Sequence, residues 1–397
     1  MEFYTVKKDV SSDKIIITDD MILTTDMATT AGSKMLDGYM SLFEAEVLTR
    51  LKSKGYVVGG KADVGEFAID LLGETSFRGA LVSDSKIKNA SCEIVKSKEV
   101  LASICLDANG SVRRGAAQYG LISVKPTYGT VSRYGIIPVA CSGDTVSILA
   151  NDTEECRNIL NVIAGHDDKD GTSLSDEICA KTGEYAPVKR VAVINDTLNK
   201  VDSDVKAKID EAVSSLKDSG VEVVFIDNGI IPLSNIAWNV LMSAELCNNV
   251  SRYDGVKYGY RAQNFNGISE LYTNSRTESF GDLLKTAILF GSETLSTENY
   301  MKVYDKCLRT RRVIVEEFGK LFKEYDAVLV PACSSLSYTE EQIANNKGIA
   351  FEENVFTAPA SITGLPAVVA GGVQLVGNAF SENALLDVAK ILAKGDK

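Results

Sequence analysis

"LDANGSVRRGAAQYGLISVKPTYGTVSRYGIIPVACS" is residues 106–142, and the fold class depends most on this stretch. The apolar run that leads into it predicts a buried strand, which ends at a Gly-Ser turn, and a helix follows from Ser111. A Ser at a helix N-terminus lies beside free backbone N–H groups, which can hold an oxyanion. The same Ser can instead cap the helix. The motif alone supports a nucleophile and a helix cap equally.

The rest of the chain alternates short apolar runs with amphipathic helices, a pattern typical of α/β proteins. Residues 15–20 predict a strand, residues 62–72 predict a helix, and residues 189–227 predict a β-α-β unit. No linker rich in Pro, Gly or Ser divides the chain. We therefore expect one domain over residues 1–397, with a helical insert at approximately 231–322.

The composition of the 397 residues, with 45% apolar and 24% charged side chains, is that of an ordinary globular protein. The net charge of -12 argues against direct binding of nucleic acid, which needs a basic surface. No apolar run reaches the length of a bilayer span, and the N-terminus lacks the apolar core of a secretory signal. We expect a cytoplasmic protein that makes no membrane contact.

The sequence gives little support for a metal-binding site or a nucleotide-binding site. His166 is the single histidine, so a zinc site built on several histidines is excluded, and the eight cysteines contain no CxxC pair. The stretch "GYVVGGKA" departs from a phosphate-binding loop because Ala62 stands where a magnesium-binding hydroxyl is needed. We expect no metal and no cofactor.

Several long blocks carry a family resemblance. "VKPTYGTVSRYGIIPVACS", "LNVIAGHDDKDGTS", "VSRYDGVKYGYRA" and "TAPASITGLPAVV" closely resemble the amidase signature family, and within it the A subunits of glutamyl-tRNA(Gln) amidotransferases. The resemblance covers almost the whole chain. It implies an α/β fold in which a mixed central β-sheet is covered by helices on both faces. It also implies a Ser–cis-Ser–Lys triad that releases ammonia from glutamine, and B- and C-type partner subunits.

The resemblance assigns the family nucleophile to Ser111, because "LDANGS" matches the family's "SDTGGS". The turn that aims the oxyanion donors then consists of Asp107, Ala108, Asn109 and Gly110. Asn109 replaces a glycine of the family. A side chain at this position restricts the backbone conformations that the turn can adopt.

The other two triad positions are changed. Thr18 stands at the family Lys, where "ITDD" (residues 17–20) replaces "IKDN", and a Thr hydroxyl is no base near neutral pH. Ile87 stands at the family cis-Ser, where "SKIKNAS" replaces "GGSSGGS". Two of the three catalytic groups are therefore missing from their expected places.

Two further positions correspond to residues that hold the glutamine substrate in the family. Arg311 matches the Arg that binds the substrate carboxylate. Asn354 falls where an Asp binds the substrate ammonium group, so the complementary charge is lost. The resemblance still implies a small amide or an amino acid as the ligand class.

Three hypotheses follow, and they leave enzyme activity open. The first is a catalytically degenerate amidase-fold protein that acts as a binding or regulatory module. The second is an active amidotransferase subunit or small-amide hydrolase, in which Ser111 attacks and Lys86 or Lys88 is a relocated base. The third is a structural scaffold with no ligand. Loss of triad members favours the first, because it typically costs about 10⁴- to 10⁶-fold in rate.

Overall fold

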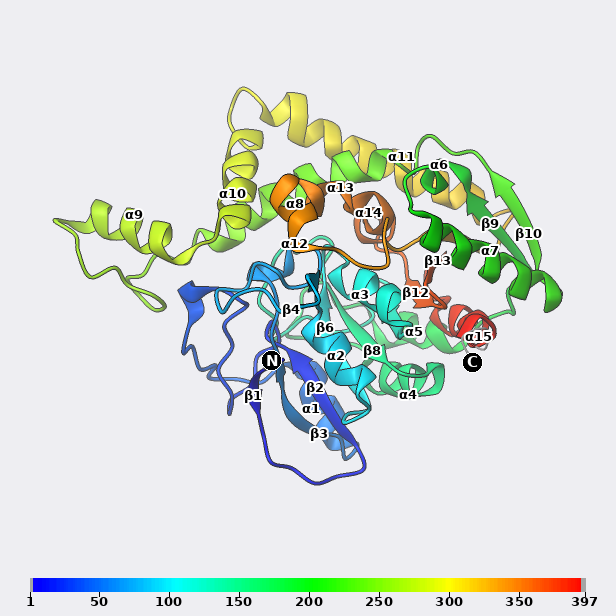
Figure 1. Ribbon diagram of the computed structural model, residues 1–397, viewed down its shortest axis with the longest axis horizontal. Coiled ribbons are helices and arrows are strands. Elements are labelled where there is room, and N and C mark those ends of the chain that lie inside the picture. The colour runs from blue at the N-terminus through cyan, green and yellow to red at the C-terminus, as the bar shows by residue number, and fades with distance from the viewer. Residues whose placement is uncertain (1–2, 394–397) are drawn as a thin grey trace.

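The computed structural model describes residues 3–393, and its centre is one large mixed sheet (Figure 1). The strands of this sheet occur in the order β1-β3-β2-β6-β8-β7-β12-β13-β11-β9-β10, and β4 and β5 form a separate hairpin. The strands are β1 (Tyr4–Lys7), β2 (Ile15–Asp19), β3 (Val57–Ala62), β4 (Val82–Ser83), β5 (Lys86–Ile87), β6 (Ala102–Asp107), β7 (Ile122–Lys125), β8 (Thr145–Ala150), β9 (Arg190–Ile194), β10 (Glu222–Ile226), β11 (Ala327–Pro331), β12 (Ala367–Ala370) and β13 (Val373–Gly377).

Helices pack around this sheet, and α11 lies along the upper edge of Figure 1 while α9 projects to the left. The helices are α1 (Glu46–Ser53), α2 (Ala90–Lys96), α3 (Ser111–Tyr119), α4 (Thr153–Ile163), α5 (Asp176–Cys179), α6 (Asn195–Leu198), α7 (Ser203–Asp218), α8 (Leu233–Val250), α9 (Ile268–Ser279), α10 (Asp282–Thr294), α11 (Asp305–Leu321), α12 (Glu340–Asn345), α13 (Ile349–Glu352), α14 (Asn354–Thr363) and α15 (Glu382–Leu392). No helix within residues 3–393 is long and apolar enough to cross a membrane.

The sheet is buried on both faces. Ile16 and Ile17 are neighbours on β2, both are fully buried, and they belong to two different hydrophobic clusters. Because successive side chains of a strand point to opposite faces, apolar side chains cover both faces of the sheet at β2. The predicted α/β class, with a mixed sheet covered by helices, is confirmed.

The two halves of the sheet are joined through the β12-β13 hairpin. Strand β12 pairs antiparallel with β7, and β13 pairs antiparallel with β11. The strands β9, β10 and β11, which are parallel to one another, therefore reach the N-terminal strands through this hairpin.

Strand β6 positions the Gly-Ser turn. It pairs with β2 on one side and with β8 on the other, so its end at Asp107 is fixed within the sheet. Gly110 follows with φ +84°, and α3 begins at Ser111. A Cβ on Gly110 would lie 2.4 Å from Cβ of Thr357, so both the backbone angle and the close approach of α14 require glycine here.

The helix predicted over residues 62–72 is wrong. The segment contains a short 3-10 turn at Glu66–Ala68, and Phe67 and Ala68 both have positive φ. The Glu74 carboxylate accepts hydrogen bonds from the backbone N–H groups of residues 71–73. Such side-chain acceptors compete with the backbone bonds of a helix, so the segment remains an irregular loop.

Candidate active site

Ser111 opens onto a small buried cavity. Its side chain is 9% exposed, and no group within residues 3–393 hydrogen-bonds its hydroxyl. The cavity has a volume of about 20 Å³. Its wall consists of Asp19, Asp63, Val64, Gly65, Ala68, Asp70, Leu72, Asn89, Ser91, Cys105, Ser111 and Val112. A single water needs roughly 10–15 Å³ of such volume, so the cavity holds one water-sized molecule and no amino acid.

The irregular loop at 63–72 supplies half of this wall, and sequence reasoning missed it because the segment read as a helix. Asp70 is 1% exposed, and its Oδ2 accepts hydrogen bonds from the backbone N–H and the hydroxyl of Thr75. Its Oδ1 has no hydrogen-bond partner within residues 3–393. Burial, together with the neighbouring Glu74 carboxylate, raises the pKa of Asp70.

Thr18, which the sequence resemblance assigns to the family Lys position, does not line the cavity. It pairs with Lys61 of β3 and Ile104 of β6, and its hydroxyl is buried without a partner among the described residues. Asp19, the next residue, lies on the cavity wall instead. Its carboxylate accepts from the backbone N–H of Leu106 at 2.7 Å and of Met21 at 3.0 Å. Burial raises the pKa of Asp19 to about 7.

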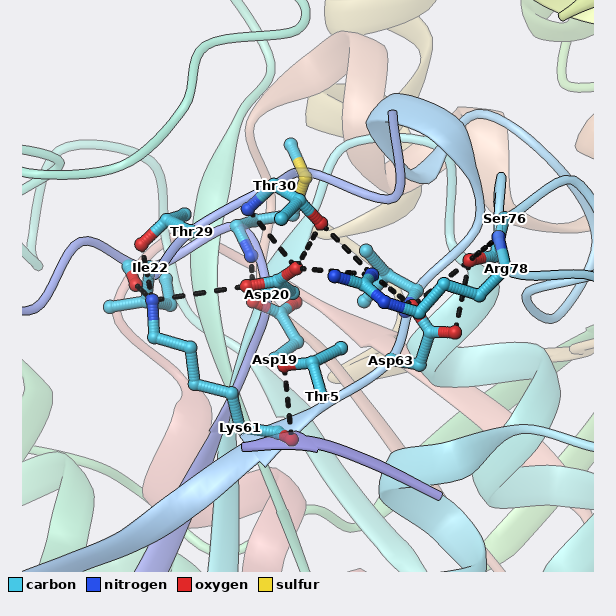
Figure 2. A network of polar contacts seen from close by, with 12 residues as sticks. Thr5, Asp19, Asp20, Ile22, Thr29, Thr30, Lys61, Asp63, Ser76 and Arg78 are labelled. Atoms are coloured by element: carbon cyan, nitrogen blue, oxygen red, sulfur yellow. Dashed lines mark hydrogen bonds and ion pairs between the residues drawn. The ribbon is translucent and has the colours of Figure 1, made fainter. Parts of the chain in front are cut away.

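A fully buried lysine lies behind Asp19 (Figure 2). Lys61 donates to the carbonyl of Ile22 at 2.8 Å and to the hydroxyl of Thr29, and its Nζ is 3.9 Å from the Asp20 carboxylate. Burial lowers the pKa of Lys61 to about 8 and raises that of Asp20 to about 6. Sequence reasoning treated Lys61 only as part of a failed phosphate loop.

Arg78 links this network to the cavity wall. Its guanidinium lies 3.9 Å from the Asp20 carboxylate and 3.4 Å from the Asp63 carboxylate, and Ser76 donates to Asp63 at 2.9 Å (Figure 2). Asp20 and Asp63 therefore each have a cationic partner. Lys61 and Arg78 are engaged with these carboxylates, and neither lines the cavity.

Ile87, which the sequence resemblance assigns to the family cis-Ser position, lies in the β4-β5 hairpin. It is 4% exposed, packs in a hydrophobic cluster, and donates its N–H to the carbonyl of Tyr338. All peptide bonds within residues 3–393 are trans. Lys86 is exposed, and the Lys88 amine lies 3.7 Å from the Glu93 carboxylate. Neither lysine is part of the cavity wall.

The turn at residues 107–110, which the resemblance predicts to aim oxyanion donors, is held by buried contacts at both ends. Asp107 forms an ion pair with Arg113 at 2.8 Å, and both side chains are fully buried. Although burial acts to raise it, the attraction of Arg113 lowers the pKa of Asp107. Ala108 is buried, and the Asn109 carboxamide donates to the carbonyl of Ile69 at 2.8 Å.

Asn354 lies in an amide cluster, which we define as Asn109, Trp238, Asn239 and Asn354, and Asn239 alone among the four is partly exposed. Asn354 is fully buried and forms a 2.7 Å hydrogen bond with Asn239. The indole Nε1 of Trp238 donates to Asn109 at 3.1 Å. Every member therefore has a partner within the protein.

Arg311 and Trp238 meet the same loop, residues 141–143. Arg311 is partly buried and donates to the carbonyl of Ser142 at 3.2 Å. Trp238 is 1% exposed, and a Cβ on Gly143 would lie 2.3 Å from its Cη2. The indole thus fills the space between the turn before Ser111 and the loop that Arg311 contacts. Sequence reasoning missed Trp238 because one Trp in an apolar helix is typical of a core residue.

The other polar side chains within residues 3–393 form no cluster of metal ligands. His166 is exposed, and its Nε2 lies 3.0 Å from Asp168. In the part of the chain that the structure describes, no three His, Cys, Asp or Glu side chains converge to hold a metal ion.

The chain is similar to known proteins over most of its length. The Amidase family model matches residues 16–386. The A subunit of glutamyl-tRNA(Gln) amidotransferase from Acinetobacter baumannii (strain ATCC 17978) is 34% identical over 383 residues, which are 91% of this chain and 78% of the relative. Its counterpart from Streptococcus pneumoniae (strain 70585) is 33% identical over 404 residues, covering 97% and 80%.

The solved structures show the same fold. The crystal structure of the glutamyl-tRNA(Gln) amidotransferase A subunit from Thermotoga maritima superposes with a TM-score of 0.80 and 25% identity, covering 98% of this chain and 86% of that one. The Kluyveromyces lactis urea amidolyase also has a TM-score of 0.80, and it is 24% identical, covering 95% of this chain and 22% of that one. The match of the family model over nearly the whole chain shows that this chain belongs to the amidase family.

Proposed function

We propose that this chain is a catalytically degenerate member of the amidase family that acts as a binding or regulatory module. The observation that carries the proposal is the cavity at Ser111, which has a volume of about 20 Å³ and no lysine in its wall. An amide substrate has no room beside the hydroxyl. A Ser hydroxyl without an adjacent base is also a poor nucleophile at neutral pH.

The site for the rest of a substrate is filled by the protein itself. Asn354 bonds to Asn239, and Trp238 occupies the space between Asn109 and Gly143. A substrate would have to displace a buried indole and break the hydrogen bonds of the amide cluster. Both changes carry a cost of several kcal/mol.

The partners follow from the relatives, whose names describe them as the A subunits of an amidotransferase. We infer B- and C-type amidotransferase subunits as partners, and a cytoplasmic location. Residues 1–397 form one amidase-like domain in this proposal, with a helical insert at approximately 231–322. The run from α8 to α11, which contains no strand of the sheet, supports the insert.

The alternative is an active amidotransferase subunit or small-amide hydrolase that uses Ser111. The free hydroxyl at the N-terminus of α3 favours it, and so does Asp19, whose pKa of about 7 suits a general base. Lys86 and Lys88 receive no support as relocated bases, since one is exposed and the other is paired with Glu93. Both oxygens of Asp19 accept backbone hydrogen bonds, which argues against the alternative.

Ammonia release from glutamine and from asparagine tests the proposal. The wild-type chain, with and without B- and C-type subunits, is compared with Ser111→Ala. The matched control is Ser203→Ala, because Ser203 is also the first residue of a helix but lies on α7. We expect equal background rates for all three. Turnover that disappears in Ser111→Ala and persists in Ser203→Ala contradicts the proposal and supports the alternative.

A further inference from the structure

A surface cleft that is separate from the Ser111 cavity is lined by four aromatic side chains. We call it the aromatic cleft, and its four rings belong to Tyr185, Phe322, Tyr325 and Phe380. They come from the loop after the 3-10 turn at 180–183, the end of α11, the residues just before β11, and the turn between β13 and α15. The cleft has a volume of about 380 Å³ and shares no lining residue with the Ser111 cavity. This volume suits a small organic molecule.

The four rings are held in place without closing the cleft. Within residues 3–393 no two of them contact one another, and Phe322 stacks on Phe318 instead. The backbone of Phe380 has φ +70°, which is uncommon for a residue other than glycine. Its N–H donates to the Thr127 hydroxyl at 2.8 Å, which holds the turn in this conformation. The rings therefore surround a space that the protein itself leaves unfilled.

Two of the rings already attract a cation from the protein. The guanidinium of Arg190 lies 4.9 Å from the ring centre of Tyr325, and that of Arg157 lies 5.9 Å from the ring centre of Tyr185. The negative face of an aromatic ring attracts cations at such distances. Neither arginine lines the aromatic cleft, so their guanidinium groups do not occupy the ring surfaces that do.

The charged side chains of the cleft also favour a cation. Its lining contains two carboxylates, from Glu184 and Asp326, and one ammonium group, from Lys181. The side chain of Glu184 has no hydrogen-bond or ion-pair partner within residues 3–393. Asp326 accepts two backbone N–H groups, and both bond to the same oxygen, Oδ2. The cleft thus has an excess of negative charge with carboxylate oxygens that a ligand can approach.

We propose that the aromatic cleft binds a small organic cation that carries an alkylated ammonium group. The alkyl groups of such a ligand pack against the rings, while its charge is attracted by the ring faces and by the carboxylates of Glu184 and Asp326. A metal ion fits poorly, because aromatic rings supply no oxygen ligands. The proposal goes beyond the proposed function and does not depend on whether Ser111 is catalytic.

Calorimetric titration of the full chain with choline tests the proposal. The comparison ligand is 3,3-dimethyl-1-butanol, which has the same shape but a neutral carbon in place of the ammonium nitrogen. We expect choline to bind one site per chain and the neutral alcohol to bind at least about 5-fold more weakly, because it lacks the cation–π attraction. Equal Kd values for the two ligands overturn the proposal. Absence of choline binding up to about 20 mM also overturns it.

Ring variants locate the site. Tyr185→Leu should weaken choline binding by about 3- to 5-fold, whereas Tyr185→Phe, which keeps the ring, should bind choline like the wild type. Tyr185 is 41% exposed, so neither change disturbs the core. The matched control is Tyr272→Leu, because Tyr272 is 39% exposed and lies on α9, away from the cleft. A Kd that is the same in Tyr185→Leu and in the wild type overturns the proposal.

Charge variants test the sign of the ligand. Glu184→Gln should weaken choline binding, and Lys181→Ala should strengthen it, because a like charge is removed from the cleft. Loss of binding in Lys181→Ala contradicts the proposal, since it means that the cleft recognises an anionic group. These titrations are independent of ammonia release at Ser111, so failure of the cation site leaves the proposed function standing.

Discussion

The two sides of the turn before Ser111 differ in how their polar atoms are satisfied. On one side, every member of the amide cluster of Asn109, Trp238, Asn239 and Asn354 has a protein partner. On the other side, Asp70 and Ser111 face a cavity with atoms that lack partners within residues 3–393. Under the proposed function, this difference means that the side of the amide cluster has become part of the core, whereas the side of Ser111 keeps the polarity of a site.

Among the substitutions that test this comparison, removal of the Trp238 indole should lower the free energy of unfolding most. Trp238→Ala deletes a side chain that is 1% exposed and is expected to cost about 3–5 kcal/mol of unfolding free energy. Urea denaturation followed by circular dichroism measures it. Trp238→Phe, which keeps most of the volume, is the control and should lose less. A cost below about 1 kcal/mol for the Ala variant would show that the indole is not part of the core.

Replacing Asn109 with the glycine that the resemblance places at this position should have an intermediate effect on the free energy of unfolding. Asn109→Gly removes the acceptor of the Trp238 indole and the donor to the Ile69 carbonyl. The unpaired buried groups are expected to cost about 1–3 kcal/mol. Denaturation with Asn248→Gly as control separates this loss from the intrinsic effect of glycine, because Asn248 is exposed on α8. Equal losses in the two variants would mean that the amide cluster adds nothing.

The buried Asp19 carboxyl on the cavity wall should make the free energy of unfolding depend on pH. The pKa of Asp19 is raised to about 7 in the folded chain from about 3.9 when unfolded, so the folded state binds more protons between these values. The contribution of Asp19 to the free energy of unfolding should therefore be greatest below about pH 4 and should fall as the pH rises towards 7. Asp19→Asn should remove a slope of at most about 1.4 kcal/mol per pH unit. Unchanged slopes in denaturation series at about pH 4.5 to 7 would assign the titration to other groups.

Much of the fold could be predicted from the sequence because strands and their turns leave local signals. The run before Ser111 became β6, and its Gly-Ser turn begins α3. The wall of the cavity could not be predicted, because residues 63–72 have a helical pattern that the Glu74 and Asp70 side chains override by binding backbone N–H groups. The role of Trp238 depends on contacts with Asn109 and Gly143, which are distant in sequence.

The β12-β13 hairpin has a consequence for how the chain acquires its structure. Strand β7 is antiparallel to β12, and Lys125 pairs with Ala367, so the central part of the sheet cannot close until both have left the ribosome. At the usual rate of synthesis the interval is roughly 10 to 50 s. During that time the edge of β7 is an open template for wrong pairing. The nascent chain should therefore depend on chaperones more than its final stability suggests.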